Sequence, residues 1–189
     1  MRVKLTTQAN RGLSKVEADL SRLAAALGDR NPGVRHRARM SLVALGPTSV
    51  PHLIAALESP RENARWEAAK SLQAIADARA APALVLRLGD GDSGVCWVAA
   101  EALIALGPKA IVPLMHGLIA HNNSSTFLDS AHHVLHDLNK GALRNIVGPV
   151  LQALDRPSPD TGAPLAAHRA LRALALGAEK AGPATPRSR

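Results

Sequence analysis

Three histidines and one aspartate stand near residue 130 at the spacing of a helix face. Asp129, His132, His133 and His136 follow at intervals of 0, 3, 4 and 7 residues, which places all four on one side of a helix. Two histidines four residues apart can bind zinc, and a carboxylate can complete the site. Asp129, His132 and His136 are therefore candidate metal ligands. The alternative is a polar outward face that carries imidazoles. Because no ligand from another helix is evident, the sequence favours this alternative and predicts no metal and no other cofactor.

The sequence offers one thiol, Cys96, as a possible nucleophile. A nucleophilic cysteine needs a base or cation that lowers its pKa, and no histidine lies close to Cys96 in the sequence. Serine, histidine and aspartate residues elsewhere are scattered without a recognisable catalytic order. We therefore expect no catalytic residues and a protein that is not an enzyme.

The elements that must position these residues repeat along the chain. A shift of 31 residues aligns Trp97 with Trp66, and a shift of 61 aligns the ALGP of 105–108 with the ALGP of 44–47. Each period contains two amphipathic helical patterns separated by a break. A two-helix unit of this size cannot bury its own apolar stripe, so neighbouring units must stack on one another. The period predicts an all-α solenoid of about four helix–turn–helix repeats with capping helices.

The expected boundaries follow from caps and breakers. Residues 1–13 form a lead-in, residues 14–176 the solenoid, and residues 177–189 a disordered tail rich in Gly, Pro, Ser and Arg. Ser14 and Glu17 form a capping box for the first helix. In the fourth repeat, a first helix ends before the turn at 140–141. A second helix through residue 154 is expected to be its partner, and a last helix over 163–176 caps the stack.

One set of equivalent positions crosses the first helices of successive repeats, and its members are His36, Trp66, Trp97 and Asp129. Two tryptophans on neighbouring helices could form an exposed anchor, because Trp is enriched at interface hot spots. Arg61 and Arg65 could supply a polar rim. The candidate partner-binding residues are therefore His36, Arg61, Arg65, Trp66 and Trp97. The alternative is that the indoles fill grooves between repeats, and the sequence favours this packing role.

The net charge of +8 is concentrated at the two ends. Residues 1–40 carry nine basic and three acidic residues, residues 41–155 eight and ten, and residues 156–189 six and two. The central repeats are thus close to neutral. Basic ends are either solvated caps and tails or contacts for acidic partners.

The composition predicts a cytoplasmic protein without membrane contact. A single cysteine fits a reduced compartment, and the N-terminal residues lack the apolar segment of a signal peptide. The most apolar stretch, residues 102–120, is interrupted at Gly107-Pro108-Lys109 and again at Pro113. A membrane-spanning helix needs about 20 predominantly apolar residues without such breaks.

The segments GVRHRARMSL (33–42), NARWEAAKSL (63–72) and GVCWVAAEAL (94–103) resemble HEAT repeats of the short bacterial phycobilisome-lyase HEAT-like type. The Asp-x-x-x-x-Val-Arg opening of this type stands at 29–35. The resemblance implies an α-solenoid, in a family of scaffolds, adaptors, assembly factors and a few enzymes. Related deoxyhypusine hydroxylases carry iron-binding His-Glu pairs, and no His-Glu dipeptide occurs here.

We therefore expect a non-catalytic protein–protein interaction module, acting as an adaptor, scaffold or assembly factor. Its protein partner and its oligomeric state are left open by the sequence. One alternative is an accessory or subunit of a bilin-lyase-type enzyme.

A second alternative is nucleic-acid binding, which needs Lys or Arg at equivalent positions of successive repeats so that phosphates are neutralised in a row. Arg35, Arg37 and Arg39 lie in the first repeat, and Arg65 and Lys70 in the second. The later repeats do not continue the series, which disfavours nucleic acid.

Overall fold

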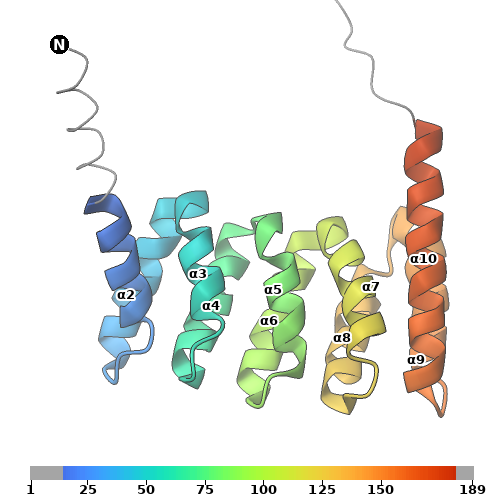
Figure 1. The fold of residues 1–189 in the computed structure, drawn as a ribbon, viewed down its shortest axis with the longest axis horizontal. Coiled ribbons are helices and arrows are strands. Elements are labelled where there is room, and N and C mark those ends of the chain that lie inside the picture. Colours follow the sequence, from blue (N-terminus) through green and yellow to red (C-terminus); the bar gives the residue numbers. More distant parts are fainter. Residues whose placement is uncertain (1–14, 182–189) are drawn as a thin grey trace, which may run out of the picture.

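The computed structural model describes residues 15–181, which form a row of paired helices (Figure 1). Residues 15–26 are helical and no strand occurs within 15–181, which confirms the predicted all-α solenoid. The helices that follow are α2 (Pro32–Leu45), α3 (Val50–Ala56), α4 (Glu62–Ile75), α5 (Ala81–Leu86), α6 (Ser93–Leu106), α7 (Ile111–Ala120), α8 (Ser125–Leu138), α9 (Arg144–Leu154) and α10 (Pro159–Ala181). Short 3-10 helices join them, namely η1 (Gly46–Ser49), η2 (Ala78–Ala80), η3 (Arg87–Gly89), η4 (Gly107–Ala110) and η5 (Gly141–Leu143).

One predicted boundary changes, and others fall outside the described residues. The lead-in 1–13, the Ser14 cap and residues 182–189 lie outside the described residues. The expected tail began at residue 177, but α10 continues through Gly177 to Ala181. The sequence Ala-Leu-Gly-Ala-Glu-Lys-Ala is rich in strong helix formers, and one internal Gly costs only about 1 kcal/mol. Composition alone was therefore a poor guide to where this helix ends.

Side-chain caps begin the first helices α2, α6 and α8, whereas α4 begins after Arg61 without a side-chain cap. Asn31 Oδ1 accepts a hydrogen bond from Gly33 N at 2.8 Å, and Asp92 Oδ1 accepts one from Val95 N at 2.9 Å. Ser124 Oγ accepts one from Phe127 N at 3.3 Å. Each cap satisfies a backbone N–H that has no partner within its helix.

Residues with positive φ angles end three of the first helices, α2, α4 and α6. Gly46 and Gly107 both have φ of 60°, and they follow α2 and α6. At the end of α4 the corresponding turn is made by Ala76, with φ of 54° in the left-handed region. A Cβ makes this conformation unfavourable by roughly 1 kcal/mol, so the backbone at the C-terminal end of α4 is strained.

The helices form two layers. The first-helix layer contains α2, α4, α6 and α8, which pack side by side in that order, and the second-helix layer contains α3, α5 and α7. Each first helix also contacts the second helix of the preceding repeat, as α4 does with α3 and α6 does with α5. Residues 15–26 lie beside α3, where Glu17 Oε1 is 2.9 Å from His52 Nε2. The first helix therefore belongs with the second-helix layer, in agreement with its expected role as a cap.

The C-terminal end departs from the predicted pairing. We expected α9 to be the second helix of the fourth repeat, but α9 packs chiefly on α8 and α10, whereas α10 packs on both α7 and α9. Thus α9 extends the first-helix layer and α10 occupies the second-helix layer beside α7 (Figure 1). The buried face of α10 consists of alanines, Ala163, Ala167 and Ala170, which allow a close approach to both neighbours.

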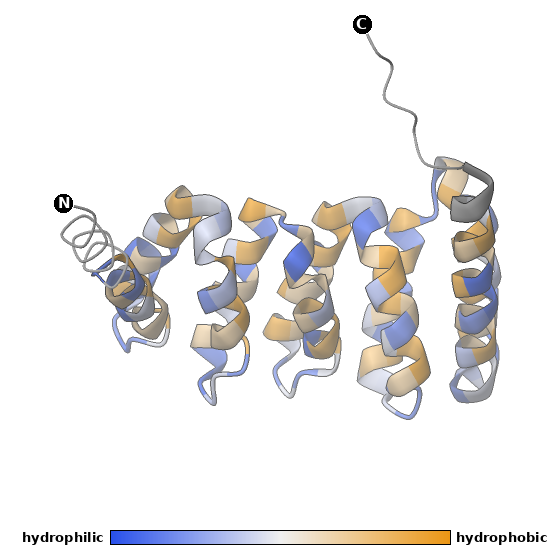
Figure 2. Ribbon diagram, turned by 45° about the horizontal axis from the view of Figure 1, so that its top comes forward, coloured by the Kyte–Doolittle hydropathy of each residue, from blue (hydrophilic) through white to orange (hydrophobic). Residues whose placement is uncertain are grey.

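The core is built from alanine and leucine at recurring positions. Four pairs one helical turn apart are nearly inaccessible in successive first helices, namely Ala38/Leu42, Ala68/Leu72, Ala99/Leu103 and Ala131/Leu135. The small residue lets neighbouring helices approach, and the leucine fills the space between layers. Hydrophilic residues gather in the loops along one edge of the row (Figure 2). The stacked repeats thus share one continuous apolar core between the two layers.

Within the described residues, one stretch, Ser93–Ala120, is long and apolar enough to cross a membrane by length and composition. It consists of α6, η4 and α7, which belong to different layers, and 56% of its most apolar window is buried in the stack. Burial in the core accounts for its hydropathy.

Candidate interaction site

Trp97 forms an exposed aromatic cluster where α6 meets α8. Its ring stacks on His133 of α8, with centroids 4.9 Å apart and planes inclined by 21°. His133 Nε2 lies 3.3 Å from Oε1 of Glu101, which is one turn after Trp97 on α6. These contacts hold the indole while 60% of Trp97 stays accessible. The cluster therefore presents a large, pre-oriented aromatic surface.

Trp66 is held more tightly than Trp97. It is 37% exposed, and its indole lies against the start of α6, where a Cβ added to Gly94 would be 3.7 Å from Trp66 Cδ1. Trp66 thus combines packing between repeats with a partly exposed edge. His36, at the equivalent position of α2, is exposed and its Nδ1 is 3.0 Å from Nη2 of Arg39. The two tryptophans therefore differ, and Trp97 is the better anchor.

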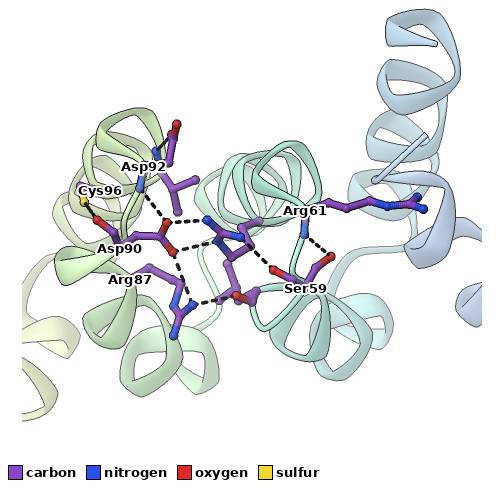
Figure 3. A network of polar contacts seen from close by, with 9 residues as sticks. Ser59, Arg61, Arg87, Asp90, Asp92 and Cys96 are labelled. Carbon is purple, nitrogen blue, oxygen red and sulfur yellow. Dashed lines mark hydrogen bonds and ion pairs between the residues drawn. The ribbon is translucent and has the colours of Figure 1, made fainter. Parts of the chain in front are cut away.

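Arg65 does not belong to an exposed rim. Its Nε and Nη2 donate to Oδ2 and Oδ1 of Asp90 at 2.8 and 2.7 Å, and its Nη1 donates to Ser59 O at 2.9 Å. The side chain of Asp90 is 3% exposed, and Arg87 Nη1 approaches it to 3.4 Å (Figure 3). The prediction that Arg65 lies on an exposed polar rim is therefore wrong, because its guanidinium is used between repeats.

The charge on Asp90 is maintained despite its burial. Burial alone would raise the pKa of Asp90. The hydrogen bonds from Arg65 and from Asp92 N, with the nearby charges of Arg65 and Arg87, outweigh burial and lower the pKa below its ordinary value. The same hydrogen bond raises the pKa of Arg65. The ion pair thus remains charged at neutral pH.

Arg61 is exposed but faces away from the aromatic cluster. Its Nη1 donates to Gly28 O at 3.0 Å, and Figure 3 shows its side chain directed toward the N-terminal helices, opposite to Asp90. Of the five predicted partner-binding residues, the structure leaves Trp97, Trp66 and His36 on the outer side of the first-helix layer. Arg61 lies at the contact with Gly28, and Arg65 lies between the second and third repeats, where it pairs with Asp90.

The histidines of α8 divide between two neighbours. His132 Nε2 is 2.9 Å from Oδ1 of Asp155 at the end of α9, and the rings of His132 and His136 stack at 6.4 Å. Both line a groove of about 570 Å³ between α8 and α9, whereas His133 turns toward α6. Asp129 is exposed.

Nowhere in residues 15–177 do three His, Cys, Asp or Glu side chains meet as a metal site would require. The candidate set Asp129, His132 and His136 is therefore not assembled. Residues on one helix face share a side of the helix but point to different neighbouring helices.

Cys96 is a buried thiol rather than a nucleophile. It is 5% exposed, and its Sγ donates to Asp90 O at 3.2 Å. Burial, together with the charge of Asp90, raises the pKa of Cys96. The side chain is therefore protonated at neutral pH, which removes the property that a reactive cysteine needs.

The sequence did not reveal a second buried ion pair. Arg39 Nε lies 2.9 Å from Glu67 Oε2, in an ion pair without hydrogen-bond alignment, and Arg35 Nε lies 3.6 Å from Glu67 Oε1. Glu67 is 7% exposed. Arg35 and Arg39 had been the start of the basic series considered for nucleic acid. A carboxylate 28 or more residues away neutralises them, which a local pattern cannot show.

Comparison with known proteins supports the repeat assignment. Residues 20–104 match the family model for HEAT repeats.

Among solved structures, a chain of the complex of CpcE and CpcF of phycocyanin lyase from Nostoc sp. PCC7120 is similar, with a TM-score of 0.55 and 24% identity. The match covers 82% of this chain and 98% of that one. At this identity the likeness concerns the fold. No protein of curated function matches the sequence. Residues 20–104 thus match HEAT repeats, and the chain folds as an α-solenoid, as its recurring helical segments predicted.

Proposed function

We propose that the protein is a non-catalytic interaction module in the cytoplasm, acting as an adaptor, scaffold or assembly factor. It binds a protein partner through the surface around Trp97. The observation that carries this proposal is the exposure of Trp97 to 60% while His133 holds its ring by stacking. Large aromatic residues fixed before binding are typical interface hot spots, because little side-chain freedom is lost on association.

The fold supports a binding role. Solenoids present extended surfaces from repeated helices, and each repeat here contacts its neighbours. The similar solved chain was itself determined in a two-protein complex. The buried thiol with a raised pKa provides no nucleophile at Cys96.

The test is affinity capture from lysate of the native host, comparing wild type with Trp97→Ala. Leu86→Ala serves as the matched control, since Leu86 is an exposed apolar residue, 50% accessible, on α5 in the other layer. Circular dichroism establishes that all three proteins are folded. We expect one defined protein to be captured by wild type and Leu86→Ala and lost with Trp97→Ala.

Equal capture by all three proteins would reject the Trp97 surface while keeping an adaptor. If nucleic acid alone were recovered, the adaptor proposal would be abandoned. The measurement that follows is the dissociation constant of the identified partner for each variant. Loss of a central hot-spot Trp is expected to weaken binding by about 2 kcal/mol or more.

A second candidate function is that of an accessory or subunit of a bilin-lyase-type enzyme. It is favoured by the similarity in fold to a chain of the phycocyanin lyase complex. Under this proposal the captured protein is a second lyase subunit or a chromophore-bearing protein. The visible absorption spectrum of the captured material distinguishes the two functions.

A further inference from the structure

The C-terminal end of the stack carries an open groove between α9 and α10. Its volume is about 450 Å³, and it is lined by residues of α9, of α10 and of the loop between them, with the buried Ala153 and Ala170 among them. Figure 1 places α9 and α10 at the end of the row. The lining combines apolar and small side chains with two arginines, chiefly Ile146, Ala153, Leu165, Ala166, Arg156 and Arg169.

Equivalent positions inside the stack are filled by a helix. The pair α2 and α3 receives α4, the pair α4 and α5 receives α6, and the pair α6 and α7 receives α8. In every case the incoming element is the first helix of the next repeat. The pair α9 and α10 is the last of this series within residues 15–181, and no described helix covers it. The groove therefore lies at the end of the row, where the first helix of a further repeat would be added.

The walls fit a helix at close range. Gly162, Ala166, Ala170 and Ala173 follow one side of α10 at helical spacing, and all four line the groove. Small residues of this kind, such as the buried Ala68 and Ala99, also lie between neighbouring first helices inside the stack and let them approach closely. Leu165 borders the groove and is 54% exposed, an apolar contact with no described partner.

The charge of the groove selects the occupant. Arg156 and Arg169 line it, and no carboxylate is among its described lining residues. Neither arginine forms an ion pair with a described carboxylate, whereas Arg35, Arg39, Arg65 and Arg87 inside the repeats all do. Unpaired guanidinium groups at the border of an apolar groove favour carboxylates on what binds there.

A second copy of this chain fits poorly. The C-terminal residues 156–189 carry six basic and two acidic residues, and the N-terminal residues 1–40 carry nine and three. Tail-to-tail and head-to-tail contacts would both bring two basic ends together. The complementary occupant is therefore a different chain.

We propose that the groove between α9 and α10 binds an acidic amphipathic helix of a protein partner, seated where the first helix of a further repeat would lie. The apolar stripe of this helix contacts Leu165 and the alanines, and its flanking Asp or Glu residues pair with Arg156 and Arg169. This surface is separate from the Trp97 cluster and does not depend on it.

The test uses a fluorescein-labelled synthetic peptide of about 18 residues, long enough to be helical, with Leu and Ala on one face and Glu on both flanks. Fluorescence anisotropy measures its binding to the full-length protein. A second peptide carries Lys in place of every Glu. We expect the Glu peptide to bind, with affinity falling as salt rises, and the Lys peptide not to bind.

Matched variants locate the binding site. Arg169→Glu is compared with Arg172→Glu, which makes the same charge change on an exposed residue of α10 outside the groove lining. Ala173→Trp, which fills the groove, is compared with Ala175→Trp, which lies elsewhere on the exposed side of the same helix. We expect the first member of each pair to weaken binding about tenfold or more, and the second to stay within about twofold.

The proposal is overturned if the Glu peptide does not bind, or if it binds both members of each pair alike, since unspecific attraction to a basic end would then suffice. Concentration-dependent self-association lost in Arg169→Glu would assign the groove to a second copy instead. Binding to anionic phospholipid vesicles without binding to the peptide would assign it to a lipid surface. Trp97→Ala should bind the peptide as wild type does.

Discussion

Arg65 and Asp90 join two repeats through a pair of parallel hydrogen bonds, 2.8 and 2.7 Å long, between groups 25 residues apart in the sequence. Both side chains are largely removed from solvent, with exposures of 14% and 3%. Paired arrangements of this kind have the strongest geometry available to an arginine and a carboxylate. The contact fixes α4 against the loop that precedes α6 and therefore sets the spacing between the second and third repeats.

Removing one partner of this ion pair should lower the stability of the folded protein. Arg65→Ala leaves the buried Asp90 with Arg87 at 3.4 Å as its remaining ion-pair partner. We expect a loss of about 3 kcal/mol in the free energy of unfolding, measured by urea denaturation. The control is Arg79→Ala, which breaks an exposed pair with Asp77 and should cost less than about 1 kcal/mol. Similar losses in both variants would contradict a structural role for the buried pair.

The same pair should make stability depend on acid pH. The pKa of Asp90 is lower in the folded protein than in the unfolded chain. The pair therefore contributes stability above about pH 4, the ordinary pKa of aspartate, and this contribution is lost as pH falls through the folded pKa. Asp90→Asn has no such carboxylate, so its unfolding free energy should fall less between pH 5 and about pH 2. Parallel curves for the two proteins would show that the pKa of Asp90 does not differ between the folded protein and the unfolded chain.

Gly117 should tolerate no side chain. It lies in α7, and a Cβ added there would collide with Val85 Cγ1 and come within 2.9 Å of Phe127 Cζ. Gly117→Ala is expected to destabilise the protein by about 1–3 kcal/mol through overpacking. Gly148→Ala is the matched control, because its added Cβ would meet Asn139 Oδ1 at 3.9 Å. This second change should be neutral or stabilise α9 by up to about 1 kcal/mol.

Ala76 offers a stabilising substitution. Its φ of 54° suits glycine, which stands at the ends of α2 and α6 with φ of 60°. Ala76→Gly should raise the thermal midpoint and add up to about 1 kcal/mol of stability, because it removes strain at the end of α4. Ala74→Gly, an exposed change within the same helix, should instead cost about 0.5–1 kcal/mol. If both lower the midpoint, the left-handed turn at Ala76 is not strained.

Cys96 should be unreactive until the protein unfolds. Its raised pKa and its burial predict that Ellman's reagent labels the native protein at least about 100-fold more slowly than the urea-unfolded chain. The absorbance of the released thiolate measures both rates. Rapid labelling of the native protein would show an accessible thiolate and would reopen the question of catalysis at Cys96.

The repeats could be predicted because their signals are local. The caps Asn31 and Asp92 and the glycines after α2 and α6 act within one or two turns of their own helices, so their positions in the sequence determine the boundaries. The layer occupied by α9 could not be predicted in this way. Its apolar stripe indicates that one face is buried, but the stripe does not identify the helices against which that face packs.

The candidate site likewise combines features that local sequence predicts with features that depend on tertiary packing. The spacing of the α8 residues correctly predicted a shared helix face, but that face is wide enough to meet α6 on one side, through His133, and α9 on the other, through His132. Arg65 was misplaced because its partner lies 25 residues away in another repeat. The exposure of Trp97 likewise depends on how far α8 covers α6, which is a property of tertiary packing.

The contacts between repeats also bear on how the length of this protein can change. Three arginines reach back to a backbone carbonyl of the preceding repeat, and they span 33, 32 and 30 residues: Arg61 to Gly28, Arg79 to Pro47 and Arg87 to Leu57. Each contact joins adjacent units through a backbone carbonyl, which every unit supplies, so a duplicated unit could form the same contact with its copy. We therefore expect gain or loss of a whole repeat to be tolerated best in the middle of the chain. The helix at residues 15–26 and α10 lie at the two ends of the described row.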